Sequence, residues 1–356
     1  MAGIVSPQGV TRHCRVEYPI HIPVLKILMK PFLIVLSVLL VVTGHLPAVS
    51  DVRPYVNDKK APENRKDLEV IQGALTQSLP KARSATVCLE MADGSGSGVI
   101  VSPEGLVLTA AHVTGGINRK ITVILEDGTK LPARSLGLVS DKDAAMVQIL
   151  DKGPFPYVEI DKNNTTLLGD WVFSLGHSGG YDKERGSVVR IGRLVRIANM
   201  TFQSDCTLIG GDSGGPLFDL NGKLIGIHSR VGQQLQVNMH VPMHVYLENW
   251  DPLLKGEFLG DGDFAKRPEK GKGFLGMATE PRKEGGLRVT KVGKSGPAEE
   301  GGVKDGDVVL KFNGMKLDTR EQMQDLLKEM SEGDKVLLEI LRGGSPLTLT
   351  CYLSAR

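Results

Sequence analysis

The stretch Gly-Gly-Asp-Ser-Gly-Gly-Pro-Leu at residues 210–217 limits the possible folds of this chain more strongly than any other segment. Glycine pairs on both sides of Ser213 let the backbone turn tightly, so that its N–H groups can point toward whatever the hydroxyl contacts. A serine hydroxyl is a weak nucleophile near neutral pH unless a base lies beside it. The stretch alone would also suit an ordinary glycine-rich turn. A catalytic role for Ser213 therefore depends on whether the chain also supplies a base and an acid.

Candidates for the base and for an acid both precede the serine. His112 ends an apolar, strand-like run, and Asp143 stands directly before a second apolar run. The order histidine, aspartate, serine is that of the chymotrypsin-type arrangement. In α/β-hydrolases the acid and the histidine follow the serine, and the histidines after Ser213 come too soon to leave room for an acid and further βα units. A hydrolase of that type is therefore disfavoured.

The sequence around these residues closely resembles the HtrA/Deg trypsin-like serine proteases. The matching segments are residues 96–112, 125–129, 143–145, 211–217 and 222–227, and the resemblance runs from about Ser84 to the C-terminus. It implies a mainly β chain with a chymotrypsin-like double β-barrel protease domain over residues 84–252. It also implies a PDZ domain over residues 273–356, joined to the protease by a linker over residues 253–272.

The resemblance also assigns roles. Ser213 would be the nucleophile and His112 the general base and then the general acid, while Asp143 would orient the imidazole and stabilise its charged form. Asp141 is the alternative acid, and Asp143 is preferred because it directly abuts the apolar strand. Backbone N–H groups of Gly211 and Ser213 are expected to form the oxyanion hole.

The residues next to the nucleophile raise two further points. His228, Ser229 and Arg230 are expected to line the substrate channel, although His228 and Arg230 could equally be solvated. Asp212 departs from the family, whose members usually carry Asn before the nucleophile. Because a carboxylate buried without a partner is costly, Asp212 must either be accessible to solvent or find a cation that the sequence does not identify.

From residue 273 the chain changes character. Residues 295–309 resemble the signature of bacterial PDZ domains. Strands are predicted over residues 287–292, 335–342 and 347–353, and a helix is predicted to open at Asp318 with Glu321 three residues later. An extended C-terminal peptide would bind between a strand at residues 274–277 and this helix. The predicted peptide-binding residues are Phe274, Leu275, Gly276, Met277, Met323 and Leu327, and simple core packing is the alternative, above all for Leu275 and Leu327.

The N-terminus predicts export. Residues 32–43 are an apolar run of 12 residues, preceded by lysines and followed by Ala-Val-Ser at residues 48–50. This length suits a signal peptide and is short for a spanning helix, which needs about 20 residues. Residues 1–50 are therefore predicted to be a signal peptide with translation starting at Met29, and the protein to be periplasmic or otherwise extracytoplasmic. An uncleaved membrane anchor over residues 32–43 is the alternative.

Residues 51–83 separate this segment from the predicted protease domain. Their first part is expected to be extended or disordered, because it combines prolines with many charges. Residues 67–79 are predicted to form a short amphipathic helix. Since family members trimerise through such segments, the resemblance implies a homotrimer or a higher homo-oligomer.

Composition excludes several classes of function. The net charge is only +2 and the charges are spread along the chain, so no nucleic-acid partner is expected. No cysteine pair or Cys/His run has metal-ligand spacing, so neither a metal nor another cofactor is expected. Cys88, Cys206 and Cys351 lie in different regions after residue 50, and their odd number argues against a disulfide framework.

Two functions remain. The first is an exported, ATP-independent serine endopeptidase that degrades unfolded or damaged proteins through an acyl-enzyme, with C-terminal peptides bound at the PDZ domain. Cleavage after apolar residues is expected, because no acidic residue is placed to receive Lys or Arg. The alternative is a catalytically idle chaperone or scaffold that keeps the protease fold. Intact His112, Asp143 and Ser213 argue against it.

Overall fold

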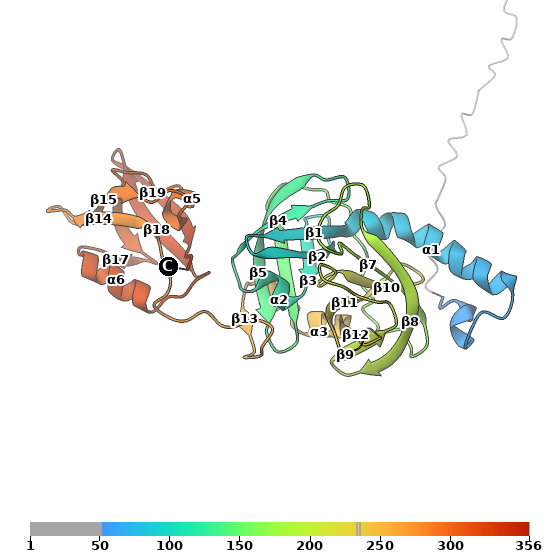
Figure 1. The fold of residues 1–356 in the computed structure, drawn as a ribbon. Coiled ribbons are helices and arrows are strands. Elements are labelled where there is room, and N and C mark those ends of the chain that lie inside the picture. The colour runs from blue at the N-terminus through green and yellow to red at the C-terminus, as the bar shows by residue number, and fades with distance from the viewer. Residues whose placement is uncertain (1–51, 233, 235, 356) are drawn as a thin grey trace, which may run out of the picture. The chain divides into compact units, whose positions relative to one another are not determined.

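The computed structural model describes residues 52–232, 234 and 236–355 (Figure 1). The predicted signal peptide, its start at Met29 and the alternative anchor over residues 32–43 lie outside the described residues. Most of the regular structure in the described part is β-strand, and the predicted fold class is confirmed. Across the same residues, no helix has the length and apolar character needed to cross a membrane.

Six antiparallel strands close the first barrel, in the order β4-β1-β2-β3-β6-β5 with β5 pairing back to β4. Alternating burial along β5 places one set of side chains inside the barrel and the other in solvent, as the two-residue period of a strand requires. A short parallel strand, β13 (Phe258–Leu259), extends the sheet from β5. The barrel strands are β1 (Thr86–Met91), β2 (Gly94–Ile100), β3 (Leu106–Thr109), β4 (Lys120–Ile124), β5 (Lys130–Val139) and β6 (Ala144–Ile149).

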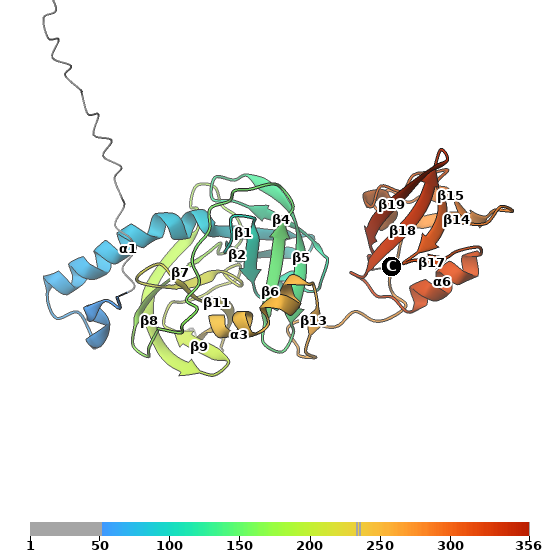
Figure 2. The same cartoon turned by 180° about the vertical axis from the view of Figure 1, so that it is seen from behind.

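A second closed barrel follows, in the order β7-β8-β9-β12-β11-β10. Closure leaves no exposed sheet edge in either barrel. Two short helices, α3 (Met243–Glu248) and α4 (Trp250–Leu254), come next; α3 contacts strands of both barrels (Figure 2), and α4 contacts β5 and β6 of the first barrel. The strands are β7 (Trp171–Gly176), β8 (Val188–Ala198), β9 (Thr201–Ser204), β10 (Pro216–Asp219), β11 (Leu224–Val231) and β12 (Asn238–Pro242).

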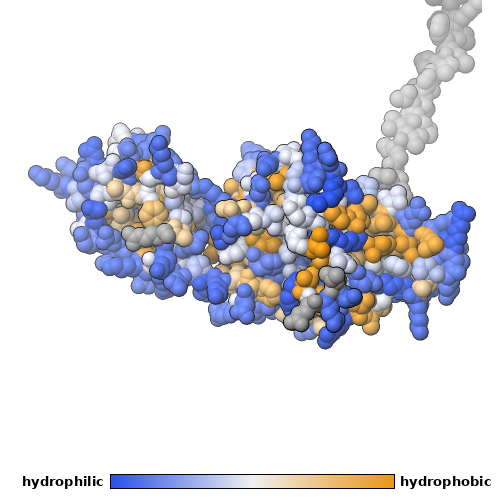
Figure 3. All heavy atoms as spheres, in the orientation of Figure 1, coloured by the Kyte–Doolittle hydropathy of each residue, from blue (hydrophilic) through white to orange (hydrophobic). Residues whose placement is uncertain are grey.

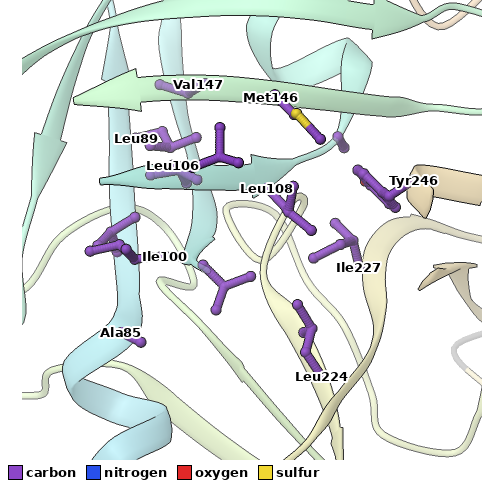
Figure 4. Packing of buried hydrophobic residues seen from close by; sticks show 14 of the residues in the cluster. Ala85, Leu89, Ile100, Leu106, Leu108, Met146, Val147, Leu224, Ile227 and Tyr246 are labelled. Atoms are coloured by element: carbon purple, nitrogen blue, oxygen red, sulfur yellow. The ribbon is translucent and has the colours of Figure 1, made fainter. Parts of the chain in front are cut away.

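One hydrophobic cluster contains residues of both barrels, and a smaller one lies within the second barrel. Figure 4 shows Leu108 of the first barrel, Ile227 of the second and Tyr246 of α3 lying close together within the cluster that spans both barrels. Tyr246 is fully buried, and its hydroxyl donates to Thr109 O at 2.7 Å. Because Thr109 ends β3 just before His112, this bond ties the histidine segment to the element that follows the second barrel.

The N-terminal segment differs from its prediction. The helix α1 spans Arg65–Ala85 and continues past Pro80, because Ala82 and Ala85 are buried against the barrel core. Before it, the short 3-10 helix η1 (Tyr55–Asp58) is ordered, since Val56 is only 1% exposed and packs in a small apolar cluster with Ile71. The expectation of an extended or disordered start is therefore wrong for η1.

The C-terminal module, residues 271–355, contains a sheet in the order β14-β15-β16-β18-β19, with β17 paired to β16. The β18–β19 hairpin turns at Gly343 and Gly344, whose φ angles of 57° and 84° suit glycine and fit the predicted turn. Its elements are β14 (Met277–Pro281), β15 (Leu287–Val292), α5 (Pro297–Glu300), β16 (Val308–Phe312), β17 (Met315–Lys316), α6 (Arg320–Lys328), β18 (Lys335–Arg342) and β19 (Ser345–Tyr352).

Helix α6 begins one residue later than predicted. Thr319, rather than Asp318, caps it, and a capping box joins Thr319 to Gln322 instead of involving Glu321. The predicted linker over residues 253–272 is also only partly a linker. Its first half contributes to α4 and β13, and Ala265 is 6% exposed in an apolar cluster of the barrel module, residues 52–267.

Candidate active site

The structure brings His112 and Asp143 together. His112 lies in the short helix α2 (Ala111–Thr114) after β3, and Asp143 lies in the turn between β5 and β6 with a φ of 57°. Nδ1 of His112 is 2.9 Å from Oδ1 of Asp143, and the His112 N–H donates to the same oxygen at 3.0 Å. The carboxylate therefore holds the Nδ1 side of the ring and leaves Nε2 for a substrate group. The alternative acid, Asp141, is exposed, and in the part of the chain that the structure describes no hydrogen bond joins it to His112.

Ser229 contributes to the same carboxylate. Its hydroxyl donates to Oδ2 of Asp143 at 2.5 Å, and the residue is 3% exposed. Asp143 itself is fully buried, and its carboxylate is held by one imidazole, one backbone N–H and one hydroxyl. The sequence predicted Ser229 only as a channel residue. A role beside the acid could not be read from it, because 86 positions separate the two residues.

Ser213 and His112 line the same cleft, with a volume of about 370 Å³. The Ser213 hydroxyl points to Ser229 O at 3.4 Å, and within the described part of the chain no hydrogen bond joins it to His112. Catalytic hydrogen bonds are often long or absent before substrate binds. The cleft residues are His112, Leu208, Ile209, Gly210, Ser213, Ser229, Arg230, Val231 and Phe264.

The loop before Ser213 has an uneven pattern of backbone hydrogen bonds. The N–H groups of Asp212, Gly214 and Gly215 donate to backbone oxygens at 3.1, 2.8 and 2.9 Å. Those of Gly211 and Ser213 donate to no atom of the described residues. These two are the donors expected for an oxyanion hole, and both are available to a ligand.

Gly211 is required by the backbone at this point. Its φ is 93°, and a Cβ there would lie 2.5 Å from His177 O. Any other residue would be strained and would collide with the neighbouring loop. The sequence-based argument that a side chain would obstruct this turn is consistent with these values.

Asp212 has the cation that the sequence left unidentified. Oδ2 of Asp212 is 3.0 Å from Nη2 of Arg190 in β8 and also accepts the Ile209 N–H at 2.9 Å. The Ser178 hydroxyl donates to Oδ1 at 2.6 Å. Asp212 is fully buried, so an internal ion pair with two further hydrogen bonds satisfies its charge.

His228 does not lie in the cleft, which corrects the expectation that it lines the substrate channel. It is fully buried inside the second barrel, where Nδ1 is 2.9 Å from Nδ1 of His240 and Nε2 is 3.1 Å from Leu175 O. Burial lowers the pKa of His228 to about 3. Nε2 of His240 is 2.8 Å from Ser204 Oγ, but this serine is also fully buried and no substrate can reach the pair.

Residues 274–276 of the PDZ domain, which were predicted to belong to a strand, form a loop before β14. Phe274 is 41% exposed, and its N–H and C=O pair with Ser354 at 2.9 and 3.1 Å. The next two N–H groups, of Leu275 and Gly276, donate to no atom of the described residues. The adjacent strand begins only at Met277, so the strand predicted over residues 274–277 is displaced.

The remaining PDZ residues divide by burial. Leu275 and Met323 are 3% and 8% exposed and belong to the core of the C-terminal module. Met277 and Leu327 are half-buried at the edge of that core. These two, with the unbonded N–H groups before them, remain the predicted contacts of a bound peptide.

Comparison with known proteins covers both modules. Residues 96–227 match the family model of the trypsin-like peptidase domain, and residues 273–353 match that of the PDZ domain. A probable periplasmic serine endoprotease, DegP-like, of Rickettsia prowazekii is 27% identical over 343 residues, which are 88% of this chain and 65% of that protein. Its counterpart in Pseudomonas savastanoi is 31% identical over 270 residues, which are 73% of this chain and 56% of that protein.

The chain thus spans somewhat less than two thirds of the length of these relatives. Among solved structures, a serine endoprotease from Yersinia pestis is 24% identical and aligns with 83% of this chain and 99% of its own, at a TM-score of 0.45. The two family matches and the curated relatives are sufficient, and this chain belongs to the HtrA/Deg type of trypsin-like serine proteases with a C-terminal PDZ domain.

Proposed function

We propose that this chain is an ATP-independent serine endopeptidase that hydrolyses peptide bonds of unfolded or damaged proteins. One observation carries the proposal: His112 and Ser213 line the same cleft, and the buried Asp143 holds the His112 ring from behind. The N–H groups of Gly211 and Ser213, beside them, have no partner among the described residues. A hydrolase that forms an acyl-enzyme needs these parts together.

In the proposed reaction the Ser213 hydroxyl turns from Ser229 O toward Nε2 of His112 and attacks the substrate carbonyl. His112 accepts the proton, and Asp143 stabilises the imidazolium at 2.9 Å. The N–H groups of Gly211 and Ser213 hold the oxyanion. His112 then protonates the leaving amine, and water repeats the sequence on the acyl-enzyme.

The same proposal includes location and partners. The relatives are described as periplasmic, which supports the predicted export. Unfolded chains would enter the cleft in extended form, and C-terminal peptides would bind at Met277 and Leu327 of the PDZ domain. Cleavage after apolar residues fits Leu208, Ile209 and Val231, which line the cleft.

We further propose a homotrimer as the assembly. Apolar side chains on the outer face of β8 are uncovered, with Ile191, Val195 and Ile197 between 41% and 46% exposed. Figure 3 shows apolar surface gathered on the barrel module beside α1. Exposed apolar patches of this kind mark association surfaces. Light scattering of the purified protein tests the expected mass of three copies, and a monomer would contradict it.

Degradation of unfolded casein by the purified protein, beside Ser213→Ala, tests the activity. We expect fragments from the wild type, none from the variant, and labelling of Ser213 by a fluorophosphonate. Neither cleavage nor labelling would favour the alternative, a catalytically idle chaperone or scaffold. Labelling without cleavage would point to a competent site that awaits an activating peptide.

A further inference from the structure

The segment that leaves the barrel module is docked against the turn that carries Asp143. The Gly262 N–H donates to Ser140 Oγ at 2.9 Å, and the Phe264 N–H donates to Ser140 O at 3.2 Å. Ala265 follows and is buried with Ala111 in an apolar cluster of the barrel module. Residues 260–265, the post-barrel segment, are therefore held in place by backbone bonds and by apolar burial.

Two glycines make this contact possible. A Cβ on Gly260 would lie 2.4 Å from Oδ1 of Asp141, and a Cβ on Gly262 would lie 2.3 Å from the Cα of Asp141. The Gly262 contact is with backbone atoms, and Gly260 has a φ of 74°, which other residues rarely adopt, so a larger residue at either position would disturb the docking. The sequence of the segment is thus fitted to the turn between β5 and β6.

Docking brings the ring of Phe264 to the cleft of the candidate active site. The ring centroid is 6.3 Å from that of His112 and 5.1 Å from the Arg230 guanidinium, and Phe264 is half-buried. The cleft is lined by this ring together with residues of the oxyanion loop. A residue of the predicted linker therefore forms part of the surface that a substrate would meet.

We propose that Phe264 is a specificity-determining residue, which forms the wall of the subsite for the residue just before the one whose carbonyl is attacked. This rests on the proposed endopeptidase function. In an extended substrate, successive side chains point to opposite sides. If the side chain at the attacked carbonyl faces Leu208 and Ile209 of the oxyanion loop, the preceding one faces His112 and Phe264. Burial against the aromatic ring favours an apolar side chain there.

The test measures kcat/KM for peptides that differ only at this residue, with Leu in one and Ser in the other. We expect the wild type to prefer Leu by about 10-fold or more, which is typical of apolar subsites. Phe264→Ala should reduce the preference to near unity, and Phe264→Leu should retain most of it. Gly262→Ala should also reduce it, although Gly262 does not line the cleft, because the added Cβ undocks the segment.

Leu254→Ala is the matched control, since Leu254 is 41% exposed in α4 and outside the cleft. In Phe264→Ala the readout is the ratio of kcat/KM for the two peptides. A change in catalysis that is common to both peptides cancels in this ratio, which separates specificity from catalysis. An unchanged preference for Leu in Phe264→Ala would overturn the proposal. An equal rise of kcat/KM for both peptides would overturn it too, since it would mean that Phe264 obstructs the cleft for any substrate. If the wild type neither cleaves nor labels, the proposed function fails, and this proposal fails with it.

Discussion

The ion pair between Arg190 and Asp212 is expected to hold the oxyanion loop, and Arg190→Met tests this. The variant keeps most of the side-chain volume but leaves a fully buried carboxylate without its cation. Removing one partner of a buried pair costs about 3–5 kcal/mol. Because Ser178 and Ile209 still donate to Asp212 and Arg190 is 18% exposed, we expect the lower end, about 3 kcal/mol.

In Arg190→Met, the oxyanion loop can relieve the unpaired charge of Asp212 only by moving so that water reaches the carboxylate. Asp212 lies between Gly211 and Ser213, so a movement that exposes its carboxylate to water also turns the two N–H groups of the oxyanion hole. Losing one such donor lowers kcat by about 10²–10³. We therefore expect Arg190→Met to lower kcat by this factor on a peptide substrate, with a smaller change in KM.

A double-mutant cycle with Asp212→Asn makes the prediction specific. Asparagine carries no charge and can still accept the Ile209 N–H, so Arg190→Met should cost well under 1 kcal/mol in that background. The readouts are kcat on a peptide and the free energy of unfolding in urea. Equal losses in both backgrounds, or an unchanged kcat in Arg190→Met, would refute the argument that the ion pair positions the loop.

Three further predictions concern the same site. Ser229→Ala removes a hydroxyl that donates to Asp143 and should lower kcat by about 10–100-fold with little change in KM, measured by steady-state kinetics; a pure KM effect would contradict this. Gly211→Ala should lower kcat by at least about 10²-fold, since its φ of 93° and the nearby His177 O exclude a Cβ, and a fully active variant would disprove it. Burial lowers the pKa of His228 to about 3 and that of His177 to about 4. Both pKa values in the folded state lie below the unfolded-state value of about 6.5, so the free energy of unfolding is unaffected by these histidines above about pH 6.5. As the pH drops from there toward the folded-state values, each histidine lowers the free energy of unfolding by about 1.4 kcal/mol per pH unit. Urea unfolding at pH 7 and pH 5 measures this, and equal stability at both would contradict it.

The sequence predicted correctly those elements whose structure depends on neighbouring residues in the chain, such as strands with alternating polarity and glycine turns. Both β15 and β18 have the bounds that alternation and the glycine turn indicate. Glycines around Ser213 predicted a loop whose N–H groups are available. Contacts that join distant segments left no such signal, since Arg190, Ser229 and Phe264 reach their partners only once the barrels close.

The error at His228 has a physical cause. Residues 224–229 of β11 are all buried: Leu224 and Ile227 pack in the cluster that spans both barrels, and Ile225 packs in the cluster of the second barrel. A strand buried on both sides has no polar–apolar alternation to say which residues face the cleft. The prediction for His228 therefore rested only on its place in the strand that follows Ser213, and it put the side chain in the cleft instead of inside the second barrel.

Asp143 and Asp212, both buried at the active site, are paired in opposite ways, and the difference follows from what each charge does. Asp212 has a permanent cation, Arg190, so its charge is balanced whether or not a substrate is present. Among the described residues, the donors to Asp143 besides the imidazole are both neutral, namely the His112 N–H and the Ser229 hydroxyl. A fixed cation beside Asp143 would cancel the attraction that favours the imidazolium when His112 takes the serine proton. Hence one carboxylate is suited to holding a loop, and the other keeps its charge for the proton transfer.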